Sequence, residues 1–156
     1  MALRVMPRER AANSRVPNFE FRHAVPVRFA DLDVLGHVNH IAYLEILEAG
    51  RIAYYYQVVG LSSVQEINFM LAEQRVRYAA SALLGQTLEV AFRVDWLKRS
   101  SSRFSFEIRD DASRQLLCEG DGVQVFVDLG TGRPKLLPDA YRARIHTFEG
   151  GPLTPP

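Results

Sequence analysis

Residues 40–60 read HIAYLEILEAGRIAYYYQVVG, and this segment decides the fold. Between His40 and Val59 there is no proline and one glycine, Gly50, while Gly60 stands where a helix C-terminus favours glycine. At about 100° per residue, apolar side chains gather on one helix face. They are Ile41, Leu44, Leu47, Ile52, Tyr54, Tyr55, Val58 and Val59. So broad an apolar face predicts one long helix over residues 40–59 that another element covers.

The element that covers this helix is predicted to be a sheet. Residues 88–97 alternate between apolar and other side chains, the period of a strand with one buried face, and residues 104–108 repeat it. The short polar link 98–102 joins the two as an antiparallel hairpin. Three further segments have strand composition: 20–29, where Pro26 favours an edge position, 67–79 and 116–128. The pattern predicts an α+β domain of about five antiparallel strands around one central helix, with a short helix at 139–148.

The composition fits a single domain and excludes several classes of function. The chain has 156 residues, of which 47% are hydrophobic and 24% charged. Nineteen Lys and Arg against eighteen Asp and Glu leave a net charge of +1, too balanced for a nucleic-acid-binding face. No apolar run is long enough to cross a membrane, and the single Cys118 has no partner for an internal disulfide. We expect a cytoplasmic protein without nucleic-acid or membrane partners.

The domain boundaries follow from local composition. Residues 1–17 are rich in arginine and contain two prolines, which predicts a flexible basic arm. Residues 18–148 contain all the predicted strands and helices and form the domain. Residues 149–156 contain two glycines and three prolines, which predicts a disordered tail.

The turn that precedes the long helix concentrates the polar residues. Asp31 and Asp33 lie in this turn, and Asp31 has a possible ion-pair partner in Arg28 at the strand end. Asn39 is suited to cap the helix by accepting a hydrogen bond from the amide of Ile41 or Ala42. The amide of His40 is then left free at the positive end of a helix, where it can stabilise an oxyanion. A carboxylate and an oxyanion donor are thereby predicted to face a common site.

Glu48 is a second candidate, because it falls in the middle of the predicted apolar face. A carboxylate in that position must be paired, desolvated or directed into a cavity. Arg51, three residues further along the helix, is a possible partner. A structural Glu48–Arg51 pair and a catalytic Glu48 are both compatible with the pattern.

Residues 28–51, RFADLDVLGHVNHIAYLEILEAGR, resemble the signature of the hotdog-fold acyl-CoA thioesterases, the family that includes 4-hydroxybenzoyl-CoA thioesterase. That signature is a strand, Asp-x-Asp-x-x-Gly, a Tyr, and then Glu-x-x-Arg on the helix. The matching residues are Asp31, Asp33, Gly36, Tyr43, Glu48 and Arg51. The resemblance implies a hotdog fold, a homodimer or homotetramer, and the hydrolysis of an acyl-CoA to a carboxylic acid and CoA without a cofactor.

The resemblance also assigns roles to residues. Asp33 becomes the nucleophile or general base and the backbone amide of His40 the oxyanion donor, with Glu48 as the alternative carboxylate that another branch of the fold uses. The expected substrate-binding residues are Gly36, His37, Asn39 and Tyr43, with Lys98, Arg99 and Arg103 on the phosphates of CoA. No metal is expected, because His37 and His40 lack a third ligand at suitable spacing.

Several structural explanations compete with these roles. Asp33 is also a favoured turn residue, Tyr43 is also a good core residue, and the 98–102 hairpin also fits a solvated tip. A non-catalytic module that binds acyl groups or CoA would use the same pocket. A dehydratase of the same fold is a weaker alternative, because its histidine and carboxylate arrangement is not evident. Apolar area for a partner subunit is expected at Trp96, residues 54–56 and Phe126.

Overall fold

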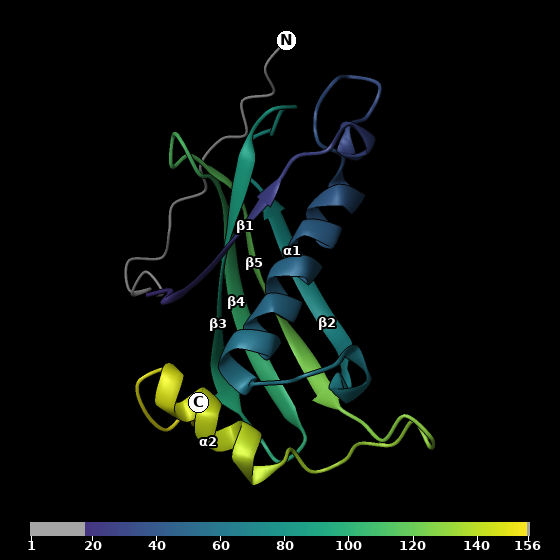
Figure 1. Ribbon diagram of the computed structural model, residues 1–156, viewed down its shortest axis with the longest axis vertical. Coiled ribbons are helices and arrows are strands. Elements are labelled where there is room, and N and C mark those ends of the chain that lie inside the picture. Colours follow the sequence, from purple (N-terminus) through teal and green to yellow (C-terminus); the bar gives the residue numbers. More distant parts are fainter. Residues whose placement is uncertain (1–17, 156) are drawn as a thin grey trace.

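The computed structural model describes residues 18–155 and shows a five-stranded antiparallel sheet with a long helix across one face (Figure 1). The strands are β1 (Phe21–Pro26), β2 (Phe69–Tyr78), β3 (Thr87–Leu97), β4 (Ser101–Asp110) and β5 (Leu116–Phe126). Their order in the sheet is β1-β3-β4-β5-β2. The predicted hotdog architecture is confirmed, including Pro26 on an edge strand. The predicted basic arm, residues 1–17, lies outside the described residues.

The central helix runs from His40 to Val59, as the sequence predicts. It consists of α1 (His40–Tyr54) and a wider π-helical turn over Tyr55–Val59. Gly60 ends it with φ +75°, a left-handed conformation that favours glycine.

The face of α1 that meets the sheet differs from the predicted one. The buried side chains include Tyr43, Ile46, Leu47 and Tyr54, whereas Ile41 and Leu44 are 57% and 38% exposed. Gly50 explains the difference, because a Cβ at this position would lie 2.5 Å from Cγ1 of Val90 on β3. The helix is apolar on most sides, so the close backbone approach at Gly50, and not the widest apolar stripe, selects the packed face.

The β3–β4 hairpin forms as predicted, with one irregularity. The register shifts between Val94 and Trp96, which places a bulge at Asp95. After the bulge Leu97 is buried and Trp96 only half-buried, which corrects the strict alternation that the sequence predicts through Trp96. The amide of Val94 donates to the carboxylate of Glu149 at 2.9 Å.

The C-terminal segment packs against the end of the sheet. Helix α2 (Asp139–Phe148) confirms the short helix and lies beside the π-helical turn. The amide of Leu97 donates to the carbonyl of Leu153 at 3.1 Å, and the Leu153 side chain packs on the core. Leu153 makes these contacts within residues 149–156, for which the sequence predicts a disordered tail.

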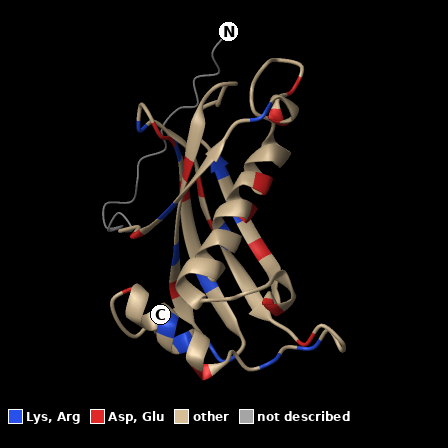
Figure 2. Cartoon of the chain, viewed as in Figure 1, with Lys and Arg blue, Asp and Glu red and all other residues tan. Residues whose placement is uncertain are grey.

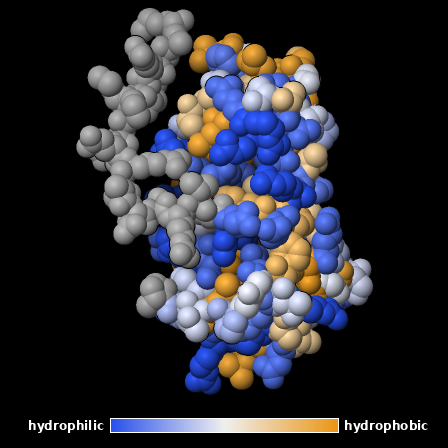
Figure 3. All heavy atoms as spheres, turned by 90° about the vertical axis from the view of Figure 1, so that its left-hand side faces the viewer, coloured by the Kyte–Doolittle hydropathy of each residue, from blue (hydrophilic) through white to orange (hydrophobic). Residues whose placement is uncertain are grey.

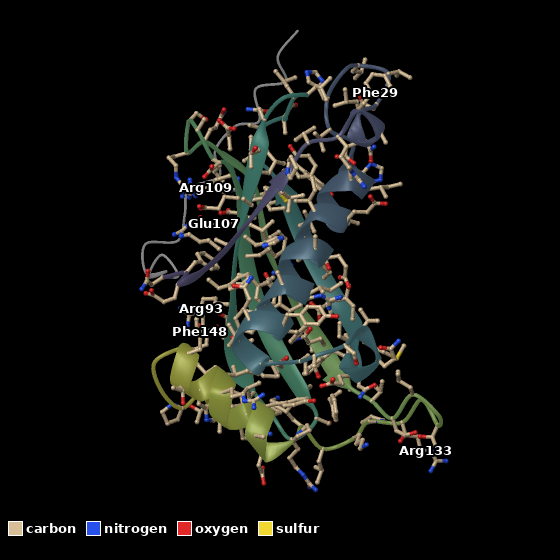
Figure 4. The ribbon with its side chains drawn as sticks, viewed as in Figure 1. Phe29, Arg93, Glu107, Arg109, Arg133 and Phe148 are labelled. Carbon is tan, nitrogen blue, oxygen red and sulfur yellow. The ribbon has the colours of Figure 1, made fainter. Side chains whose placement is uncertain are left out.

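The other face of the sheet carries charged side chains in pairs. Arg109 contacts Glu107 at 2.7 Å on β4, and both lie on the side of the sheet away from α1 (Figure 4). Arg103 of the same strand contacts Asp121 of β5 at 2.5 Å. Neither helix among residues 18–155 is long and apolar enough to cross a membrane.

Candidate functional site

Backbone hydrogen bonds join the two sides of the loop between β1 and α1. Leu32 and Val38 form an isolated antiparallel bridge, and the amide of Asp33 donates to the carbonyl of His37 at 2.8 Å. Gly36 makes the turn possible with φ +76°, and its amide donates to the carbonyl of Asp33 at 3.0 Å. Asp33 is therefore held by backbone hydrogen bonds on both sides of the turn.

Asp31 anchors the base of this loop. Its carboxylate is 2% exposed and accepts the Arg28 amide at 2.7 Å and the guanidinium at 2.6 Å. These contacts confirm the predicted Arg28–Asp31 pair. The hydrogen bonds from Arg28 hold the pKa of Asp31 below its usual range. The backbone amide and Nδ2 of Asn39 both donate to the Asp31 carbonyl at 2.9 Å, which joins the loop to the helix start.

The Asp33 side chain has a different environment. It is exposed, and its Oδ1 accepts the amides of Leu35 at 2.8 Å and His37 at 3.3 Å. No hydrogen bond to Oδ2 comes from residues 18–155. One carboxylate oxygen of Asp33 thus shapes the turn, as the structural explanation expects, while the other stays free for chemistry.

The N-terminus of α1 supplies the predicted hydrogen-bond donors. The side chain of Asn39 accepts from the Ala42 amide at 2.9 Å, which confirms Asn39 as the cap. The amides of His40 and Ile41 find no acceptor in the described part of the chain. These two amides lie at the positive end of the helix dipole, where an anion or a developing oxyanion is stabilised.

Tyr43 joins the helix start to the β2–β3 loop. Its hydroxyl accepts from the Ala82 amide at 3.0 Å and lies 3.2 Å from the Ala80 carbonyl, to which it donates. Burial raises the pKa of Tyr43 to about 12, which keeps the hydroxyl protonated at neutral pH. The side chain is 3% exposed. Tyr43 therefore holds the β2–β3 loop in place. Its hydroxyl is already hydrogen-bonded to the backbone of that loop.

The β2–β3 loop is the part of the site that sequence reasoning missed. The Val38 amide donates to the Ala82 carbonyl at 2.9 Å, and His37 bridges to Leu83. The loop therefore forms a wall beside His37 and Tyr43. The small residues of this loop and Gly85 could have indicated its close approach from the sequence, because such residues permit close backbone contact.

Glu48 lies on the exposed side of α1, which corrects its predicted position within a buried apolar face. Its side chain is 49% exposed and forms an ion pair with Arg51, so the predicted partner is confirmed. Arg51 is buried and donates to Oε1 of Gln124 at 3.2 Å, and Gln124 donates to Ser102 at 2.9 Å. Glu48 is thus the exposed end of a hydrogen-bonded series whose other members, Arg51, Gln124 and Ser102, are buried. The sequence did not predict this series.

The basic residues expected on the CoA phosphates are not brought to the Asp33 loop of the same chain. Lys98 and Arg99 lie in the β3–β4 turn, at the end of β3 opposite to Thr87, which pairs with Pro26 near the loop. Figure 4 shows the same separation, with Phe29 at one end of the molecule and Arg133 and Phe148 at the other. Arg103 is paired with Asp121 on the sheet face away from α1. Within one chain the predicted site residues thus form two groups.

Hydrophobic side chains surround the Asp33 end. The exposed large residues there are Phe29, Val34, Leu35, Leu83 and Leu84, with exposed fractions from 49% to 101%. Figure 3 shows hydrophobic residues at the upper end of the molecule, along with others in the middle and at the lower end of the face it draws. The site therefore combines a carboxylate, two free amides and apolar surroundings, which suits a substrate with a reactive carbonyl and an apolar group.

Comparison with known proteins agrees with this chemistry. A family model described as Thioesterase-like superfamily matches residues 27–145. The chain belongs to the thioesterase-like superfamily. Membership and the solved neighbours named thioesterases support thioester hydrolase activity. No curated protein matches the sequence.

Solved thioesterase structures support the assignment. A thioesterase from Thermus thermophilus, complexed with coenzyme A and Zn, is 38% identical with a TM-score of 0.77, covering 86% of this chain and 98% of that one. A thioesterase superfamily protein from Jannaschia sp. CCS1 is 26% identical with a TM-score of 0.76, covering 88% and 87%. A 1,4-dihydroxy-2-naphthoyl-CoA thioesterase from Synechocystis shares the fold at 23% identity and a TM-score of 0.71, covering 80% and 94%.

Proposed function

We propose that this superfamily member hydrolyses an acyl-CoA thioester to a carboxylic acid and CoA, with Asp33 as nucleophile or general base. One observation carries the proposal. The exposed Asp33 carboxylate, with Oδ2 free, lies on the loop that leads into α1, where the His40 amide has no acceptor among residues 18–155. The coenzyme A in the Thermus thermophilus relative supports CoA as the carrier group.

The chemistry follows from these two groups. As a general base, Asp33 takes a proton from water while the water oxygen attacks the thioester carbon. The carbonyl oxygen gains negative charge and accepts a hydrogen bond from the His40 amide. The C–S bond then breaks, the carbonyl re-forms, and the CoA thiolate takes up a proton. As a nucleophile, Asp33 would instead attack the thioester carbon, expel the CoA thiolate as the C–S bond breaks, and form a mixed anhydride that water hydrolyses to the acid and free Asp33.

The remaining residues of the proposed site surround these groups. Gly36, His37 and Asn39 shape the loop, and Tyr43 holds the β2–β3 loop beside it. Glu48 is the alternative carboxylate. We place the protein in the branch that includes 4-hydroxybenzoyl-CoA thioesterase, on the strength of the Asp31-to-Arg51 signature.

The proposed active form is a homodimer or homotetramer. Strand β2 is a sheet edge, and its Met70 and Leu71 are 54% and 45% exposed. An apolar edge of this kind favours pairing with a second copy. Three of the side chains expected at this contact are not available to it, because Tyr54, Tyr55 and Phe126 are buried within the single chain.

Release of CoA thiol from a panel of short, long and aromatic acyl-CoAs tests the function. We expect turnover with at least one acyl group, and a loss of at least about 100-fold for Asp33→Asn. Glu48→Gln is the comparison variant, because it removes the alternative carboxylate, which lies on α1. Full activity of Asp33→Asn would refute the assigned role.

A non-catalytic acyl or CoA-binding module is the second candidate. It is favoured by the use of Asp33 Oδ1 in the turn, which gives this aspartate a structural role without catalysis. Saturable binding of acyl-CoA without thiol release across the whole panel would establish this alternative.

A further inference from the structure

Strand β2 has an open edge and two charged side chains without partners. It pairs only with β5, so no other strand of the described chain uses its second edge. Arg77 of β2 forms an ion pair with Glu119 of β5. Glu73 and Arg75 are exposed, and neither forms an ion pair with another of residues 18–155. Figure 2 shows both acidic and basic segments along β2.

The two unpaired charges lie on the same face of the sheet. Arg75 lies opposite Asp121 of β5, which contacts Arg103 on the face away from α1. Side chains two residues apart in a strand share a face, so Glu73 lies on this face too. Gln74, between them, lies on the α1 face. A strand added to the open edge of β2 can therefore reach both charges from one side of the sheet.

The positions of these charges select one way for β2 to pair with a copy of itself. In a two-fold antiparallel pair centred on Gln74, Glu73 of each copy lies opposite Arg75 of the other. Both unpaired charges then have partners of opposite sign. A centre at Glu73 or at Arg75 places that residue opposite its own copy, and a centre at Val76 places Arg75 opposite Arg77. Like charges in opposite positions are destabilising.

We propose that β2 pairs antiparallel with β2 of a second copy, centred on Gln74, with an ion pair between Glu73 and Arg75 on each side of the axis. The other sheet edge suits pairing less well, because β1 has six residues and ends at Pro26, whereas β2 has ten residues. The inference specifies the partner of the proposed active form. It rests on the proposed function only for its effect on turnover.

This register brings the second copy to the start of α1. The hydroxyl of Tyr78, at the end of β2, donates to the His40 carbonyl at 3.4 Å. Leu71 is 45% exposed and lies opposite Gln124, whose buried side chain faces α1, so Leu71 lies on the α1 face as well. With Gln74 at the axis, Leu71 of the second copy lies next to Val76 and Tyr78. Each proposed site is thereby bordered by an apolar side chain from the other copy.

Disulfide cross-linking measures the register directly. In an antiparallel pair, opposite Cα atoms are about 4.5 to 5.5 Å apart, within the range that a disulfide spans. We expect oxidised Gln74→Cys to run as a covalent dimer on a non-reducing gel, whereas wild type does not, because its single Cys118 is buried. Arg75→Cys and Val76→Cys report the neighbouring registers and should give at least about tenfold less covalent dimer.

Charge reversal tests the ion pairs. Glu73→Arg and Arg75→Glu each place like charges opposite each other twice in the dimer, and each should raise the Kd of the dimer at least about tenfold. The double variant restores opposite charges and should return Kd to within about threefold of wild type. Arg133→Glu is the matched control, because it reverses an exposed cation outside β2. Analytical ultracentrifugation measures Kd, and circular dichroism checks that each variant is folded.

A monomeric wild type overturns the proposal, as does cross-linking of Arg75→Cys or Val76→Cys in place of Gln74→Cys. A double variant as weakly associated as the single variants also overturns it. These measurements need no substrate, so their outcome is separate from that of the hydrolysis assay. A dimer with the Gln74 register that releases no thiol from any acyl-CoA would refute the proposed function and support the register.

Discussion

The two halves of the β1–α1 loop place the same side chain in opposite surroundings. In the inner half, Asp31 is buried and its carboxylate accepts hydrogen bonds from Arg28. In the outer half, Asp33 is exposed, and only its Oδ1 is hydrogen-bonded within residues 18–155. A carboxylate with both oxygens hydrogen-bonded within the protein stabilises the fold, whereas one with a free oxygen is available to a substrate. Two residues of sequence separation therefore divide a structural carboxylate from the one that we propose to be catalytic.

The largest expected effect is on turnover: Asp33→Asn removes the carboxylate with the free oxygen and should lower turnover at least about 100-fold. The free energy of unfolding should stay within about 0.5 kcal/mol of wild type, because the Asn side-chain oxygen can still accept from the Leu35 and His37 amides. Thiol release and urea unfolding measure the two quantities. A large loss of stability with normal activity would reverse the roles of the two aspartates.

Asp31→Asn should show the opposite behaviour. The substitution removes the charge that Arg28 contacts while keeping the shape, and we expect about 1 to 3 kcal/mol of destabilisation. Urea unfolding measures the shift, with Asp111→Asn as a control because Asp111 is exposed and its contact with Arg114 is long, at 3.5 Å. An unchanged unfolding midpoint would show that the pair of exposed Arg28 with buried Asp31 adds no stability.

Asn39→Ala should cost about 1 kcal/mol, the usual loss of a helix cap. The side chain also joins α1 to Asp31 through Nδ2, so the variant loosens the helix start. Asn39→Asp separates the two contacts, because aspartate can cap the Ala42 amide but cannot donate to the Asp31 carbonyl. Urea unfolding compares the three proteins, and equal stability of the Ala and Asp variants would indicate that the cap itself adds little.

The pH dependence of stability should follow the inner aspartate. The pKa of Asp31 is lowered in the folded chain by hydrogen bonds from Arg28, so folding is favoured when this group is ionised. Its contribution is present above the unfolded pKa of about 4 and is lost as pH falls through the lower folded pKa. Urea titrations from neutral to acid pH should show a shallower decline for Asp31→Asn. An identical decline in both proteins would assign acid sensitivity to other groups.

The smallest effect is expected for Glu48→Gln, with turnover changed by less than about threefold. Its side chain is half-exposed, and a Gln at this position can still accept from Arg51, which is buried and also donates to Gln124. Thiol release at saturating substrate is the measurement. A loss as large as that of Asp33→Asn would move the catalytic carboxylate onto the helix.

The sequence predicted the helix, the strands and the loop signature because each depends on local rules. Period-two alternation marked β3 and β4, Gly60 marked the helix end, and Asn39 marked its start. The pairing of Arg28 with Asp31 also followed from spacing alone. The same local reasoning failed for Glu48, because a helix that is apolar on most sides gives no single face from its wheel.

Tertiary structure decided what local rules leave open. The contact of Gly50 with Val90 selected the packed helix face and left Glu48 exposed. The β2–β3 loop reached His37 and Tyr43 across about 40 residues of sequence, and the length of β3 separated Lys98 and Arg99 from Asp33. The sequence by itself thus determined the elements and named the candidate site residues. The division of these residues into two distant groups depended on sheet register and close packing, which no local pattern encodes.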